Sequence, residues 1–173
     1  MPNCSSSIVG AVLLDCLNSN GGIDEIKIKT FDSTLSGITV TSGVGTLAGA
    51  ALSGWKLFEC EEETSMADDA GATSSTEATT VYTQTITYIN NKLKASFRNT
   101  LNNMHAMRTH VAIKDNNGLV WLFGYERGMI VSASSGSTGT AFNERNGYSL
   151  TLTGREKQPI VSISNTWTAL IDA

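Results

Sequence analysis

Residues Thr79–Ile89 read TTVYTQTITYI, and this stretch decides how the rest of the chain can fold. Its β-branched and aromatic side chains alternate with a period of two, which predicts a long β-strand. Asn90 and Asn91 follow directly, and their side-chain oxygens can accept hydrogen bonds from the free amides of a first helical turn. We therefore predict a strand that passes directly into a helix.

The helix is expected over about residues 91–108 because one apolar stripe recurs there at spacings of three and four. The stripe consists of Leu93, Phe97, Leu101, Met104 and Met107. Beyond it the period returns to two. Val111–Lys114 and Leu119–Gly124 flank a four-residue turn, Asp115–Gly118, whose Asn-Gly pair favours positive φ. This pattern predicts a β-hairpin after the helix, and the stripe must be buried against a neighbouring sheet.

The remaining segments are interpreted mainly as short strands. Thr64–Ala78 has no periodicity and is predicted to be a long polar loop (residues 64–78), whereas residues 43–54 are rich in Gly and Ala and fit no period. Ser134–Thr140 is interpreted as a flexible loop, and Gly154–Pro159 as a break in a strand. Further strands are predicted at Ile8–Leu14, Ile23–Phe31, Gly37–Ser42, Trp55–Glu63, Met129–Ala133, Tyr148–Thr153 and Ile160–Ile163.

These elements define a mainly β (α+β) chain with about eight strands and one flanking helix. We expect a single domain over residues 1–173, folded as a β-sandwich or barrel. Proline is almost absent, with two in the chain, so the edge strands of the sheets have few of the residues that block pairing. A free edge of this kind is often used for assembly.

Composition restricts the function. The net charge of −4 argues against a surface that grips phosphates, although it permits one past which DNA slides. Cys4, Cys16 and Cys60 are widely spaced and form no Cys-x-x-Cys pair, so we expect reduced thiols and neither zinc nor a disulfide framework. No apolar run is long enough to span a bilayer, and no membrane association is expected.

No catalytic, metal or cofactor site is expected. His105 and His110 are five residues apart, which places them on different faces of a helix, and no third ligand lies near them in sequence. The glycines at Gly43, Gly45 and Gly49 resemble a dinucleotide loop only loosely, because the third glycine comes one residue late. We therefore predict a protein that is not an enzyme.

An acidic set is the most informative charge feature of the sequence. It has two interpretations: a solvated strand end and loop, or a negative surface that lines a passage and repels phosphates. Its members are Glu59, Glu61, Glu62, Glu63, Asp68 and Asp69.

The second half of the chain resembles a family of phage structural proteins from phages and prophages of Bacteroides-type gut bacteria. The resemblance is clearest over residues 79–158 and weaker at Asp15-Cys16 and Gly21-Gly22. It is carried by VYTQTIT at 81–87, Lys92–Leu93, VAIKDNNG at 111–118, WLFG at 121–124, the loop 136–140, RNGY at 145–148, the strand 149–153 and Gly154-x-Glu156-Lys157.

This resemblance implies a virion protein of the tail, assembled in the host cytoplasm, with no catalytic residues. The family implied is the major tail tube protein, in which six subunits join their sheets edge to edge and the rings stack into a tube. Its partners would be other copies of itself, other tail or neck proteins, and genome DNA that passes through the lumen during ejection without specific binding. The acidic set would then lie in a lumen or stacking segment.

Within this hypothesis the strands Trp55–Glu63 and Thr79–Ile89 form a long hairpin facing the lumen, with residues 64–78 as its tip. An inter-subunit contact loop is expected at Ser134, Gly136, Thr138, Thr140 and Phe142. Two alternatives remain open: a head–tail connector or tail-terminator protein that forms one ring, and a β domain that binds a small ligand.

Overall fold

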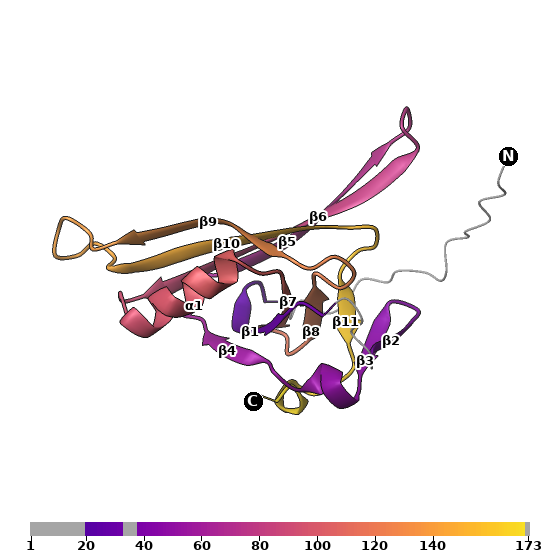
Figure 1. Ribbon diagram of the computed structural model, residues 1–173, viewed down its shortest axis with the longest axis horizontal. Coiled ribbons are helices and arrows are strands. Elements are labelled where there is room, and N and C mark those ends of the chain that lie inside the picture. Colours follow the sequence, from indigo (N-terminus) through magenta and orange to yellow (C-terminus); the bar gives the residue numbers. More distant parts are fainter. Residues whose placement is uncertain (1–19, 33–37, 172–173) are drawn as a thin grey trace, which may run out of the picture.

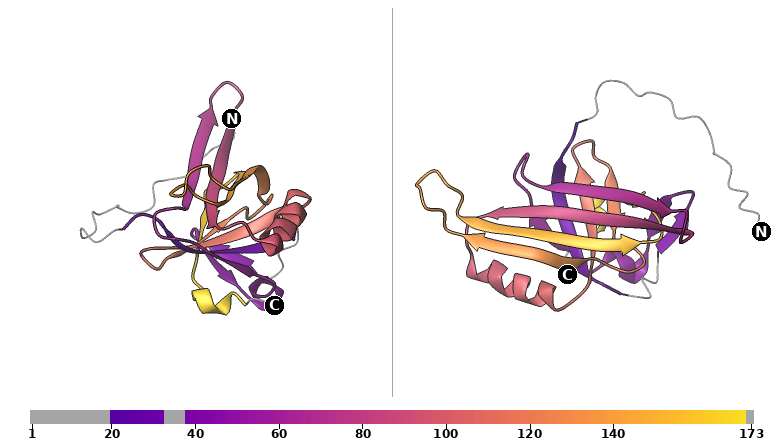
Figure 2. Two further views of the ribbon diagram at one scale, coloured as in Figure 1. Left: turned by 90° about the vertical axis from the view of Figure 1, so that its left-hand side faces the viewer. Right: turned by 90° about the horizontal axis from the view of Figure 1, so that it is seen from above.

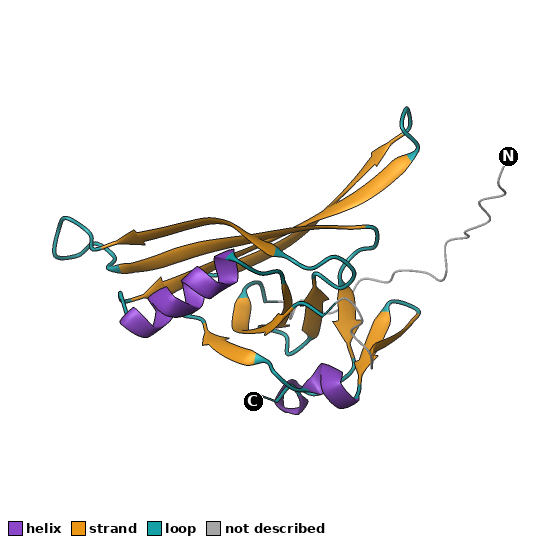
Figure 3. Cartoon of the chain, viewed as in Figure 1, coloured by secondary structure: helices purple, strands orange, loops and turns teal. Residues whose placement is uncertain are grey.

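A computed structural model describes residues 20–32 and 38–171 of the chain. The described residues form two β-sheets, with one α-helix under the end of the smaller sheet (Figure 1, Figure 3). This confirms the expectation of a mainly β sandwich with one flanking helix. The predicted strand Ile8–Leu14 lies outside the described residues. The strands and helices are β1 (Ile23–Thr30), β2 (Ile38–Thr41), β3 (Val44–Leu47), η1 (Gly49–Leu52), β4 (Lys56–Glu59), β5 (Met66–Ser74), β6 (Thr79–Asn91), α1 (Ala95–His105), β7 (Thr109–Asp115), β8 (Val120–Phe123), β9 (Ile130–Ser137), β10 (Gly147–Glu156), β11 (Val161–Ile163) and η2 (Trp167–Ala169).

The larger sheet has seven strands in the order β2-β3-β11-β8-β7-β1-β4. Its β7–β8 hairpin turns at Asp115–Gly118, as the sequence predicted. Asp115 Oδ1 accepts hydrogen bonds from the amides of Asn117 and Leu119 at 2.9 and 2.8 Å, and Gly118 has a φ of 82°. The turn is therefore held by its own aspartate and by a glycine in the left-handed region.

The smaller sheet has four strands in the order β5-β6-β10-β9, and each strand is antiparallel to its neighbours. The predicted loop at 64–78 is wrong, because Met66–Ser74 forms β5 and only the short tip beyond it is a turn. The predicted hairpin partner is also wrong: β4 pairs with β1 in the other sheet. Most of β5 is exposed, and its sequence, MADDAGATS, consists mainly of small side chains. It therefore shows no alternation of apolar and polar residues from which a strand could be predicted.

Two further boundaries differ from expectation. β9 runs on to Ser137 through the predicted flexible loop, and β10 continues past Gly154 to Glu156. Gly154 does not break the strand because it pairs with Gln84 of β6, and its lack of a side chain leaves room for Met129: an added Cβ would lie 3.2 Å from Met129 Cγ. The unassigned residues 43–54 form β3 and η1.

Helix α1 begins at Ala95, later than the predicted start near residue 91. Asn91 still pairs with Gly147 of β10, so it belongs to β6 and caps no helix. The predicted stripe is confirmed in part: Phe97, Leu101 and Met104 pack against the main core, whereas Leu93 and Met107 lie outside α1. The helix thus lies along the inner side of the four-stranded sheet, next to β9 (Figure 2).

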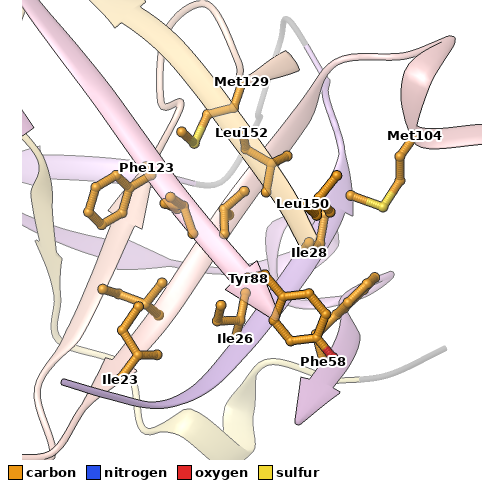
Figure 4. Close-up of a cluster of buried hydrophobic side chains, with 13 residues drawn as sticks. Ile23, Ile26, Ile28, Phe58, Tyr88, Met104, Phe123, Met129, Leu150 and Leu152 are labelled. Carbon is orange, nitrogen blue, oxygen red and sulfur yellow. The ribbon is translucent and has the colours of Figure 1, made fainter. Parts of the chain in front are cut away.

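The main core lies between the two sheets (Figure 4). Ile26 and Ile28 of β1 face Leu150 and Leu152 of β10, and all four are buried. A second cluster on the other side of the seven-stranded sheet gathers around Trp55. The four-stranded sheet therefore contributes only one of its two faces to the core.

Candidate functional site

The outer face of the four-stranded sheet is covered by no described element of the chain (Figure 1). On β6 the side chains of Gln84, Ile86 and Tyr88 are buried, whereas those of the alternate residues are not. The strand registers place the outward residues of all four strands on this same side, which we call the open face. It consists of Met66, Asp68, Ala70, Ala72, Ser74, Thr79, Val81, Thr83, Thr85, Thr87, Ile89, Ile130, Ala133, Ser135, Ser137, Ser149, Thr151, Thr153 and Arg155.

The chemistry of the open face is unusually uniform. Most of its side chains are threonine, serine or alanine, and its two charges, on Asp68 and Arg155, are of opposite sign. Such a surface offers hydroxyl groups to water but few cations to phosphates, so it does not favour retention of nucleic acid.

Both edges of this sheet are free within the described residues. β5 and β9 have a partner on one side each, and neither contains a proline or a lysine. The register of β5 with β6 is continuous, whereas β9 has one irregularity opposite Thr151 and Leu152. These strands therefore present unpaired backbone groups with few of the features that prevent pairing with another chain.

The directions of the two edge strands determine how one copy could pair with another. Because four strands alternate in direction, β5 and β9 run opposite ways. A second copy related by rotation about an axis that runs along the strands would set its β9 antiparallel to β5 of the first copy. Repetition of this step gives one continuous antiparallel sheet whose open faces lie on the same side.

The acidic set that sequence reasoning grouped together is distributed over several elements. Glu59 ends β4, and residues 61–63 form a turn in which Glu61 accepts a hydrogen bond from Asn91 at the end of β6. Asp68 lies on the open face, whereas Asp69 points inward and accepts a hydrogen bond from the amide of Ile160 at 3.0 Å. Of the predicted lumen residues, Asp68 alone belongs to the open face.

The predicted contact loop is likewise divided. Ser134 and Gly136 belong to β9, and Ser134 Oγ is 2.9 Å from His105 Nε2 of α1. Thr138, Thr140 and Phe142 lie in the connection between β9 and β10, where the Phe142 side chain is fully exposed. Only this second group projects from the end of the sheet (Figure 2).

A buried polar cluster, which sequence reasoning missed, holds the connection from β8 to β9. Gln84 Oε1 accepts a hydrogen bond from the amide of Gly124 at 2.8 Å. His110 Nδ1 lies 2.7 Å from the carbonyl oxygen of the same Gly124. Glu156 accepts from the amide of Arg127 at 2.9 Å and from that of the preceding residue at 3.2 Å. These three side chains fix the point where the chain crosses from one sheet to the other.

Burial sets the ionisation of this cluster. It raises the pKa of Glu156, an effect that the hydrogen bonds from backbone amides oppose. It lowers the pKa of His110, so the neutral imidazole is favoured. The sequence does contain a signal for two members: Gln84 and Glu156 occupy the inward phase of their strands, in which Ile86 of β6 and Leu150 and Leu152 of β10 are buried apolar residues.

Neither the protein-family models, nor the curated proteins, nor the solved structures contain a match to this chain. Within residues 20–32 and 38–171, no three His, Cys, Asp or Glu side chains are grouped so that they could hold a metal ion. None of the helices in the described part has the length and apolar character required to cross a membrane.

Proposed function

We propose that this protein is a structural virion protein whose copies pair through β5 and β9 into a ring, and whose rings stack into a phage tail tube. The observation that carries the proposal is the four-stranded sheet itself. It has one uncovered face of small polar side chains and two free edges that run in opposite directions. The resemblance of residues 79–158 to phage tail proteins supports the same conclusion.

The dimensions are compatible with passage of DNA. Six four-stranded sheets give a barrel of about 24 strands. With strands about 4.8 Å apart and tilted by about 40°, the backbone diameter is roughly 50 Å, and short side chains reduce it little. A duplex fits inside. The charges of Asp68 and Arg155 balance on the open face, so excess positive charge that could retain phosphates is confined to its β9 edge, where Arg108 and Arg127 lie.

The same surfaces would serve a head–tail connector or tail terminator that forms a single ring. The feature that favours a tube is the length of the β5–β6 hairpin. β6 pairs with β10 only from Tyr82 onward, so the tip of the hairpin projects beyond the rest of the sheet (Figure 1). A projection of this kind can reach a neighbouring ring.

Negative-stain electron microscopy of the purified protein over a range of concentrations tests the proposal. We expect rings with a central hole at intermediate concentration and tubes with a regular axial repeat at high concentration. Rings that never stack would favour the connector or terminator. Featureless small particles at every concentration would reject assembly and favour a ligand-binding β domain.

A further inference from the structure

Three arginine side chains line one hollow of about 550 Å³ at the start of β9. Arg108 precedes β7, Arg127 lies in the turn before β9, and Arg155 lies on β10. Thr83 and Thr153 of the open face line the same hollow. The arginine cluster, by which we mean these three arginines, is therefore at the β9 edge of the open face.

The arginine cluster has no compensating carboxylate among the residues that the structure describes. The lining of the hollow contains no Asp or Glu, and Arg108 Nη1 donates instead to the carbonyl oxygen of Arg127 at 2.8 Å. The carboxylate of Glu156 follows Arg155 but accepts hydrogen bonds from backbone amides on the inner side. Three like charges around one hollow repel each other, so an external carboxylate would stabilise them.

The opposite edge of the same sheet carries such a carboxylate. Asp68 is exposed on β5, its side chain points to the open face, and its carboxylate makes no hydrogen bond or ion pair with another described residue. The registers place Asp68, Thr85, Thr153 and Ile130 in one row across the sheet. Asp68 and the arginine cluster thus lie at a similar height on the strands, but about 14 Å apart at opposite edges.

We propose that Asp68 of one copy lies against the arginine cluster of the next copy and thereby sets the register of β5–β9 pairing. This inference rests on the proposed ring. Antiparallel pairing without stagger would place Asp68 beside Ile130 of the neighbour, which lines the same hollow as the arginine cluster. A charge pair is needed there because β5 and β9 consist mainly of small side chains, which specify register weakly.

Charge reversal with rescue tests this pairing. Asp68→Arg adds a fourth cation to the arginine cluster, and we expect it to raise the concentration needed for ring formation by about tenfold or more. Arg155→Asp should have a similar effect. The double variant, Asp68→Arg with Arg155→Asp, should assemble within a few-fold of the wild type. Glu77→Arg is the matched control, because it changes the net charge equally at the exposed tip of the hairpin.

Once circular dichroism shows that the variants are folded, each outcome supports or overturns the pairing of Asp68 with the arginine cluster. Asp68→Arg that forms rings as readily as the wild type would overturn the inference, as would a double variant no better than the single ones. If the arginine variants assemble normally but lose retention on heparin, the cluster binds polyanions and the inference is again overturned. A wild-type protein that forms no ring would instead reject the proposed function, and the inference with it.

Discussion

Three buried polar side chains, Gln84, His110 and Glu156, bind backbone groups that apolar side chains could not bind. The connection between β8 and β9 leaves one sheet and enters the other, so several of its amides and carbonyls have no partner in either sheet, although Met129 pairs with Thr109. Gln84 and Glu156 accept hydrogen bonds from three of these amides, and His110 binds a carbonyl oxygen. A buried backbone group without a partner would cost about 1–3 kcal/mol, which explains the presence of polar groups in the core.

Replacement of Glu156 by glutamine should destabilise the fold. The glutamine amide can accept with its oxygen only, so its NH₂ group would face a backbone amide that also donates. We expect the free energy of unfolding to fall by about 1–3 kcal/mol, measured by urea denaturation. Glu126→Gln is the control, because that side chain accepts only a 3.4 Å hydrogen bond from Gln158. Equal stability of the two variants would contradict this account of Glu156.

His110 should make stability depend on pH. Its Nε2 accepts from the amide of Asp32 at 3.2 Å, so the neutral ring fits the site, and burial lowers its pKa in the folded state. Between its ordinary pKa of about 6.5 and the lower folded value, the unfolded chain binds the proton and the folded chain does not. The free energy of unfolding should therefore fall as the pH decreases through this range.

Urea denaturation at a series of pH values from 7.5 down to 5.5 measures this slope. His110→Gln should remove most of it, whereas His105→Gln, at an exposed position, should retain it. A slope that survives the loss of His110 would assign the pH dependence to other groups.

Individual elements differ in how well the sequence predicts them, and the difference has a physical cause. β6, α1 and the β7–β8 hairpin carry their signals locally, as side-chain alternation, an apolar stripe and an Asn-Gly turn. β5 has none of these, because it is a strand only through its pairing with β6. The start of α1 was predicted too early because pairing with β10 keeps Asn91 in the sheet.

The candidate site was predictable only in part for the same reason. Free edges were expected from the shortage of proline, but which strands form them depends on pairing across the whole chain. The acidic set looked like one surface because its members are close in sequence. Pleating then turns Asp68 outward and Asp69 inward, and the turn at residues 61–63 separates the glutamates from both.

Lysine at both free edges should prevent assembly without unfolding the protein. Ala70→Lys on β5 combined with Ser135→Lys on β9 introduces bulk and like charge where two copies would meet. Sedimentation velocity should then show monomer at concentrations where the wild type forms rings. Thr87→Lys, on the central strand β6, is the control and should still assemble. Rings formed by the edge variant at wild-type concentration would show that other surfaces join the copies.

At the scale of the whole molecule, the two ends of the four-stranded sheet have different extensions. The β5–β6 hairpin projects at one end, and the β9–β10 connection with the exposed Phe142 projects at the other (Figure 2). If rings stack along the strand direction, these extensions are what neighbouring rings would meet first. In the proposed assembly, ring closure and ring stacking would therefore depend on separate parts of the chain.

Shortening the hairpin should separate these two steps. Replacement of residues 73–80 by an Asn-Gly turn removes the projecting tip but keeps the pairing of Met66–Gly71 with β6. We expect electron micrographs with rings but no tubes. Tubes of normal length from this variant would exclude the hairpin tip from stacking.

Hydrogen–deuterium exchange can show whether β5 and β9 are paired between copies, as we propose. Exchange followed by mass spectrometry compares the protein assembled at high concentration with the protein diluted to monomer. We expect the amides of Met66–Ser74 and Ile130–Ser137 to exchange more slowly in the assembly, while those of β6 and β10 change little. Equal rates at these two edges in both states, or a protein that stays monomeric at every concentration, would contradict it.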